Sequence, residues 1–106
     1  AYNAVSMLLD KELSEDIRSD IRKIVMSCAH IKGMHDLRTH DLGSNYMFEL
    51  HLELDGNLSL NTAHKYCDEV EAQLRQKYPQ AQIIIHEDPV GLTEDRLDDH
   101  LGHCNL

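Results

Sequence analysis

Residues 83–89 read Ile-Ile-Ile-His-Glu-Asp-Pro, and we expect the rest of the chain to be organised around this stretch. Three consecutive β-branched isoleucines predict a buried core strand, which Pro89 ends because proline has no N–H for a sheet ladder. Side chains alternate along a strand, so Ile84, His86 and Asp88 are expected on one face. An imidazole beside a carboxylate on a rigid strand is half of a site for a divalent metal ion.

The composition narrows the class of protein. The chain has 106 residues, enough for one domain with a single core. Ten basic and nineteen acidic side chains give a formal charge of -9, which argues against nucleic-acid binding and suits the attraction of cations. Eight histidines are the strongest compositional sign of metal binding. No apolar run approaches the roughly 20 residues of a transmembrane helix, so we expect no direct membrane insertion of these residues.

Three cysteines, Cys28, Cys67 and Cys104, are widely spaced and form no Cys-x-x-Cys motif. They predict reduced thiols and neither a disulfide framework nor a thiolate zinc knuckle. Cys28 and Cys67 fall on apolar helical stripes and are expected to be core thiols.

The first half of the chain predicts a helix followed by a hairpin. A helix is expected over residues 14–28, capped by Ser14 and apolar along one stripe. Strands are expected over 34–41 and 46–54, joined by turn residues. Strict alternation places His35 with Leu37 and Thr39 on one face of the first strand, and His51 on the polar face of the second.

The second half predicts another helix and the closing strand. Ser59 is expected to cap a helix with the stripe Leu60, Ala63, Cys67, Val70 and Leu74, which Tyr78-Pro79 stops. The element order α-β-β-α-β predicts an open two-layer α/β (α+β) sandwich with helices on one face. The other face, with His51 and His35, is left to solvent or a partner, and exposed edges favour self-association into a homodimer. Residues 91–106 form an acidic tail, with a short helix expected over 93–101.

Four separated motifs carry a resemblance: residues 33–39 (GMHDLRT), 49–53 (ELHLE), 63–64 (AH) and 84–89 (IIHEDP). Together they resemble the cytoplasmic C-terminal domain of cation diffusion facilitator transporters, especially the bacterial zinc/iron exporters. The resemblance covers about residues 7–90. It assigns residues 1–13 to a lead-in from a transmembrane domain and residues 14–90 to the metal-binding domain.

The resemblance implies a ferredoxin-like, metallochaperone-type fold and a homodimer on the cytoplasmic side of the bacterial inner membrane. It also implies a two-metal zinc site whose ligands correspond to His35, His51, His64, His86 and Asp88, with Asp88 bridging the ions. Such a domain senses cytosolic metal and is not an enzyme. Cation:proton antiport belongs to the transmembrane domain of the same transporter.

Neighbouring acids extend this expected site. Asp36, Glu49 and Glu53 are candidates to accept hydrogen bonds from the ligating imidazoles. Glu87 stands where the family often has glutamine, which could add a carboxylate to the site. His40 stands where relatives usually have arginine and is either a weak extra ligand or none. His100, His103 and Cys104 have chelating spacing if helical, although a solvated tail is favoured.

Other metals and other functions are compatible with the same residues. His/Asp sites also accept Fe2+, Cd2+, Co2+ or Ni2+, so zinc is the expected metal and not a unique one. A small His/Asp metallohydrolase is one alternative, although the chain has no evident nucleophile or Gly-rich phosphate loop. A soluble metal-binding protein of the copper-chaperone type is another, and the missing Cys-x-x-Cys argues against it.

Overall fold

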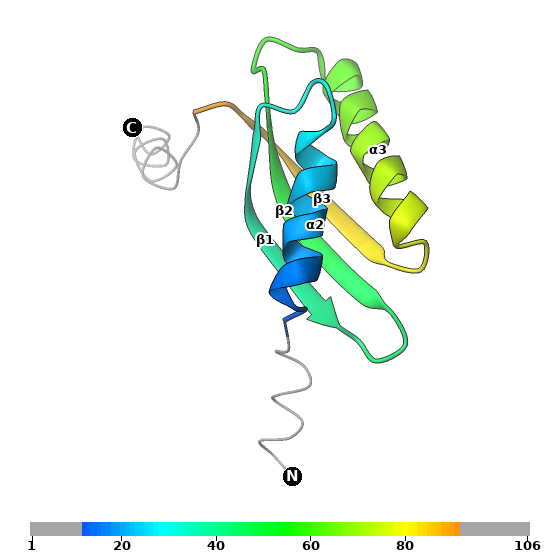
Figure 1. The fold of residues 1–106 in the computed structure, drawn as a ribbon. Coiled ribbons are helices and arrows are strands. Elements are labelled where there is room, and N and C mark those ends of the chain that lie inside the picture. The colour runs from blue at the N-terminus through cyan, green and yellow to red at the C-terminus, as the bar shows by residue number, and fades with distance from the viewer. Residues whose placement is uncertain (1–11, 92–106) are drawn as a thin grey trace, which may run out of the picture.

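The computed structural model describes residues 12–91. The elements follow as α2 (Glu15–Met26), β1 (Gly33–Asp41), β2 (Tyr46–Leu54), α3 (Leu60–Lys77) and β3 (Gln82–Pro89). The strands form one sheet in the order β1-β2-β3, and both helices pack on the same face of it (Figure 1). The predicted order and the two-layer α+β class are confirmed. Within residues 12–91, neither helix has the length and apolarity that a bilayer crossing requires.

Capping residues fix where the helices begin. The Ser14 side chain accepts a hydrogen bond from the Ile17 N–H, and Ser59 accepts one from Thr62 at the start of α3. Helix α3 ends at Lys77, directly before Tyr78-Pro79 as predicted. Leu60, expected on the buried stripe, is instead 86% exposed. It stands in the first turn, while the fully packed part of the stripe begins farther along α3.

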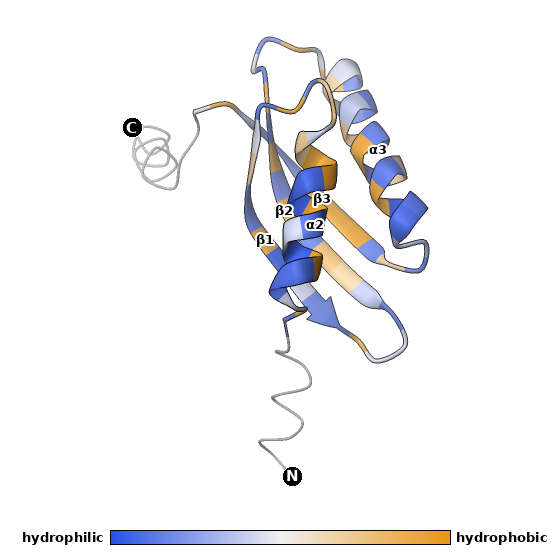
Figure 2. Cartoon of the chain, in the orientation of Figure 1, coloured by the Kyte–Doolittle hydropathy of each residue, from blue (hydrophilic) through white to orange (hydrophobic). Residues whose placement is uncertain are grey.

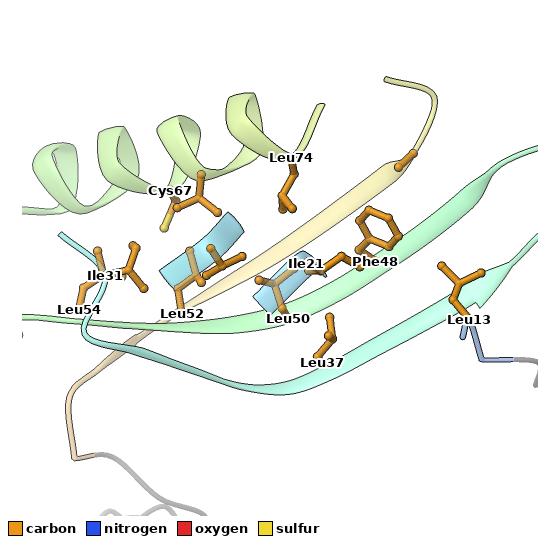
Figure 3. Packing of buried hydrophobic residues seen from close by; sticks show 13 residues of the cluster. Leu13, Ile21, Ile31, Leu37, Phe48, Leu50, Leu52, Leu54, Cys67 and Leu74 are labelled. Atoms are coloured by element: carbon orange, nitrogen blue, oxygen red, sulfur yellow. The ribbon is translucent and has the colours of Figure 1, made fainter. Parts of the chain in front are cut away.

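The core lies between the helices and one face of the sheet, and β2 is its centre (Figure 3). From Phe48 to Leu54 every second side chain of β2 is buried there, whereas the other side chains of the strand are partly exposed. The apolar colour of both helices likewise gathers toward the sheet (Figure 2). The buried apolar side chains are Leu13, Ile21, Val25, Ile31, Leu37, Phe48, Leu50, Leu52, Leu54, Cys67, Val70, Leu74 and Ala81.

Strand β3 is an edge strand, so the prediction of a buried core strand at residues 83–88 is wrong. It pairs in parallel with β2 alone among the described strands. Ile83 and Ile85 are half-buried against the core, but Ile84 on the other face is 43% exposed. The alternation itself is as predicted. What the sequence could not reveal is that the helices cover only one face of this strand.

A bulge interrupts β1 and changes the face of its first half. The register with β2 shifts between His35 and Arg38, and Asp36 adopts a left-handed backbone with φ 53°. A bulge adds one residue and breaks the alternation of side chains. Leu37 and Thr39 therefore point into the core while His35 lies opposite His51 on the open face. The predicted common face for His35, Leu37 and Thr39 is wrong for this reason.

Hydrogen bonds of Thr39 link the segment before α2 to β1. Its hydroxyl is fully buried, accepts the Leu13 N–H at 3.0 Å and donates to the Glu12 carboxylate at 2.6 Å. Arg18 pairs with the same Glu12 oxygen. Burial raises the pKa of Glu12, but hydrogen bonds from Thr39 and the charge of Arg18 outweigh it and hold the pKa below its usual value.

Candidate metal centre

Three histidines lie in a row across the open face of the sheet. His35 pairs with His51 in the antiparallel β1–β2 ladder, and His51 pairs with His86 in the parallel β2–β3 ladder. Their rings are stacked, with centroids 4.9 Å apart for His35 and His51 and 4.5 Å apart for His51 and His86. Residues from positions far apart in the sequence thus become direct neighbours on one surface.

Asp88 joins two of these histidines into a compact group. One of its carboxylate oxygens, Oδ2, lies 2.9 Å from Nδ1 of His51 and 3.3 Å from Nε2 of His35. Within residues 12–91, His35, His51 and Asp88 form the group of potential metal-binding side chains (His, Cys, Asp or Glu) whose donor atoms all lie within 4.8 Å of one another. Two imidazoles and a carboxylate are a donor set that zinc accepts, and a tetrahedral ion at ~2.0–2.2 Å from each leaves its fourth position open. The residues present therefore fit a divalent metal.

Glu53 holds the outer nitrogen of His35. Its Oε2 lies 2.9 Å from Nδ1 of His35, so the opposite nitrogen is turned toward Asp88. Such a carboxylate behind an imidazole fixes the tautomer and the orientation of the ring. Gly33 makes room for it, because a Cβ there would stand 3.3 Å from the Glu53 carboxylate. Glu53 is one of the acids predicted for this role, whereas nothing in the sequence indicates the part played by Gly33.

His86 stands at the edge of the row and has a carboxylate of its own. Its Nε2 lies 2.9 Å from Oε2 of Glu49. This hydrogen bond lowers the pKa of the Glu49 carboxyl from its ordinary value, and nearby positive charge adds to the effect. His86 therefore lies beside the group of His35, His51 and Asp88, and its role as a ligand stays a prediction.

His64 lies on the other side of the sheet. It extends from α3, with Nε2 3.4 Å from Asp68 and Nδ1 3.6 Å from Glu87. Glu87 alternates with His86 and Asp88 along β3, so it points to the helix face. The structure therefore brings four of the five expected ligands onto the open face, and within one chain it does not bring His64 to them. Its role as a ligand stays a prediction.

Cys67 lies beneath His64, one turn farther along α3. It is 5% exposed, and its sulfur points from the helix toward the sheet (Figure 3). Burial raises the pKa of this thiol to about 12, with the Glu87 carboxylate and a hydrogen bond to it adding to the rise. The prediction that Cys67 is a core thiol is confirmed, and its contact with Glu87 was not foreseen.

Among residues 12–91, Asp36, His40 and His30 are not part of the group of His35, His51 and Asp88. Asp36 forms the bulge beside His35, and His40 lies farther along β1 opposite Met47. His30 stacks on Tyr66 with centroids 3.9 Å apart. The tail residues His100, His103 and Cys104, together with the helix expected over 93–101, lie outside the described residues.

The fold and this site define a class of protein: a ferredoxin-like α+β domain with a candidate His/Asp metal centre on its uncovered sheet face. Residues 13–90 match the family described as cation efflux protein, cytoplasmic domain. The chain belongs to this family.

Individual relatives support the same family assignment. The chain is 44% identical over 89 residues to the cation-efflux pump FieF of Shewanella oneidensis, which covers 84% of the chain and 30% of the relative. It is 44% identical over 91 residues to protein p34 of Rickettsia prowazekii, covering 86% of the chain and 30% of that protein. The chain thus spans less than a third of the length of these two relatives.

Solved structures share the fold. A zinc form of the candidate zinc transporter CzrB is 31% identical, with a TM-score of 0.73, and the match covers 81% of this chain and 99% of that one. A nickel form of a MamM CTD variant has a TM-score of 0.67 at 17% identity, covering 72% and 98% of the two chains. The second likeness concerns the fold alone.

Proposed function

We propose that this chain is the regulatory, zinc-binding and dimer-forming cytoplasmic domain of a divalent-cation efflux transporter. Its family is that of cytoplasmic domains of cation efflux proteins. The observation that carries the metal-binding part is the convergence of His35, His51 and Asp88 on the open sheet face. Transport, as cation:proton antiport, then belongs to a membrane domain of the same protein.

Zinc is the metal that we propose for this site. Imidazole and carboxylate are borderline and hard donors that suit Zn2+, and CzrB offers a 31%-identical structure in a zinc form. Iron, cadmium, cobalt and nickel as divalent ions satisfy the same donors, so selectivity rests on geometry and supply. We propose that His86 and Glu49 lie at the margin, where a second ion could be held beside the first.

Metal binding would favour a homodimer through charge. Each chain carries a formal charge of -9, so two chains repel each other at neutral pH. Divalent ions bound on the uncovered face would reduce that repulsion. Because they would then bind the dimer more favourably than the monomer, they would shift the equilibrium toward the dimer. The domain would thereby convert cytosolic metal concentration into a change in dimer geometry or population.

Zinc calorimetry on the purified chain, with sedimentation equilibrium in parallel, tests this proposal. In the wild-type chain we expect zinc-dependent heat and a larger dimer fraction when zinc is present. In Asp88→Asn we expect the heat of binding at the open face and the increase in dimer fraction to be lost. Asp36→Asn is the matched control, since it removes a neighbouring carboxylate and asparagine tolerates the same left-handed backbone. Absence of zinc-dependent heat in the folded wild-type chain would refute the proposal.

A further inference from the structure

Strand β1 is attached to the rest of the molecule at two places besides its ladder with β2. It is an edge strand, since among the described strands it pairs with β2 alone. On the open face its His35 lies beside His51 of β2 and the carboxylate of Asp88 on β3. Farther along the strand, Thr39 is bonded to the segment before α2. The two attachments lie on either side of the bulge at Asp36.

The attachment at Thr39 is a closed cluster of hydrogen bonds. One carboxylate oxygen of Glu12, Oε2, accepts the Thr39 backbone N–H at 3.2 Å and its hydroxyl at 2.6 Å, and it also pairs with Arg18. The same hydroxyl accepts the Leu13 N–H at 3.0 Å. Thr39 is the one buried polar side chain among residues 12–91, so moving the segment away would leave its hydroxyl buried without these partners. The bonds of the cluster should therefore form and break together.

We propose that the contact of Glu12 and Leu13 with Thr39 couples metal binding on the open face to the segment before α2. A metal ion held by His35 and its neighbours would tie β1 to the other two strands. The Thr39 contact ties the same strand to the segment before α2. Both stabilise the docked position of one edge strand, whose ends otherwise open locally, and each therefore favours the other.

This inference rests on the proposed function, in which the segment before α2 connects the domain to the membrane domain. A displacement of the segment that opens the Thr39 contact would weaken zinc binding. Zinc binding would oppose the displacement by the same factor, because coupling between two equilibria is reciprocal. Thr39 and Glu12 are thus positioning residues that act on His35 through β1 and do not touch the ion.

Amide hydrogen exchange of the full chain, followed by NMR with and without saturating zinc, tests the coupling at the segment before α2. We expect zinc to slow exchange of the Leu13 amide by about threefold to tenfold, because this amide exchanges when its bond to Thr39 opens. The Ile17 amide is the matched control. It is bonded to the Ser14 side chain within the cap of α2, so its exchange rate should not change with zinc.

Zinc calorimetry of variants measures the reciprocal effect. Thr39→Val removes the hydroxyl and should weaken zinc affinity by about threefold to tenfold, whereas Thr39→Ser keeps the hydroxyl and should stay within about twofold of wild type. Glu12→Gln changes a side chain that is 43% exposed, so it tests the same contact with little risk to folding, and it should also weaken zinc binding. Ser59→Ala, which removes the cap of α3, should leave zinc affinity unchanged. Circular dichroism checks that each variant is folded.

The outcomes separate this inference from the proposed function. Zinc binding with an unchanged Leu13 exchange rate would overturn the coupling and leave the proposed zinc site standing. Wild-type zinc affinity in both Glu12→Gln and folded Thr39→Val would do the same. A wild-type chain that gives no zinc-dependent heat would refute the zinc site and the coupling together.

Discussion

The carboxylate of Asp88 lies 2.9 Å from Nδ1 of His51, although the two residues are 37 positions apart in the chain. The parallel pairing of β2 with β3 creates this contact, because it sets Glu53 opposite Asp88 and His51 opposite His86 on the same face. A shift of β3 by one residue would turn Asp88 toward the helices. The candidate metal centre is thus a consequence of strand register.

The histidines of the row should not be equivalent. We expect His51→Ala to weaken zinc binding by more than about a hundredfold, since it removes a converging ligand, and His86→Ala to weaken it by about tenfold because His86 supports the group from its edge. Calorimetry of each variant measures this. His30→Ala, whose ring stacks on Tyr66, is the control. Equal losses in His51→Ala and His86→Ala would contradict this ranking.

Glu53 should matter for affinity without touching the ion. Glu53→Gln weakens the hydrogen bond that orients His35, so we expect a loss of roughly tenfold to a hundredfold in zinc affinity with little change in stability. Gly33→Ala should cause a smaller loss in the same direction, since its Cβ displaces the Glu53 carboxylate. Competition with a chromophoric chelator gives the affinities. Glu71→Gln, which disturbs only an ion pair on α3, should have no effect.

The bulge at Asp36 should limit which residues are tolerated there. Asp36→Val places a β-branched side chain at φ 53° and should destabilise the fold by about 1–2 kcal/mol, while Asp36→Gly should be neutral within a few tenths. Urea unfolding measures both variants. If the bulge also sets the position of His35, zinc affinity should fall in Asp36→Val and not in Asp36→Gly. Equal stability of the valine and glycine variants would refute the role of the backbone conformation.

The contact between Thr39 and Glu12 should make stability depend on acid pH. Glu12 has a lowered pKa in the folded chain, so its ionised form stabilises the fold above the unfolded pKa and this contribution is lost as pH falls through the folded value. Thr39→Val leaves the Leu13 N–H and Glu12 without this partner, and should cost about 1–3 kcal/mol near neutral pH.

Unfolding by urea between about pH 3 and 7 measures this dependence. Both Thr39→Val and Glu12→Gln should flatten the acid limb of the stability curve relative to wild type. Ser59→Ala, which removes the cap of α3 and no contact with a carboxylate, serves as a control that costs about 1 kcal/mol and leaves the acid limb unchanged. An unchanged acid limb in Glu12→Gln would show that this carboxylate does not contribute.

The sequence by itself determined the elements and most of the open face. Alternation in residues 46–54 placed His51 opposite the core, and the alternation of residues 83–88 placed His86 beside Asp88. Ser14 and Ser59 marked the helix starts because a capping hydroxyl acts within its own turn. These features follow from local rules, in which a residue and its near neighbours suffice.

Only the tertiary structure decided the members of the site. A single left-handed residue, Asp36, shifts the register of β1 and moves His35 onto the open face, against strict alternation. Packing of α3 on the opposite face carries His64 away from the other histidines and beside Glu87 and Cys67. Register and layer assignment depend on long-range packing, which the order of residues does not display. The stretch from Ile83 to Asp88 accordingly turned out to be the edge of the sheet, and β2 its centre.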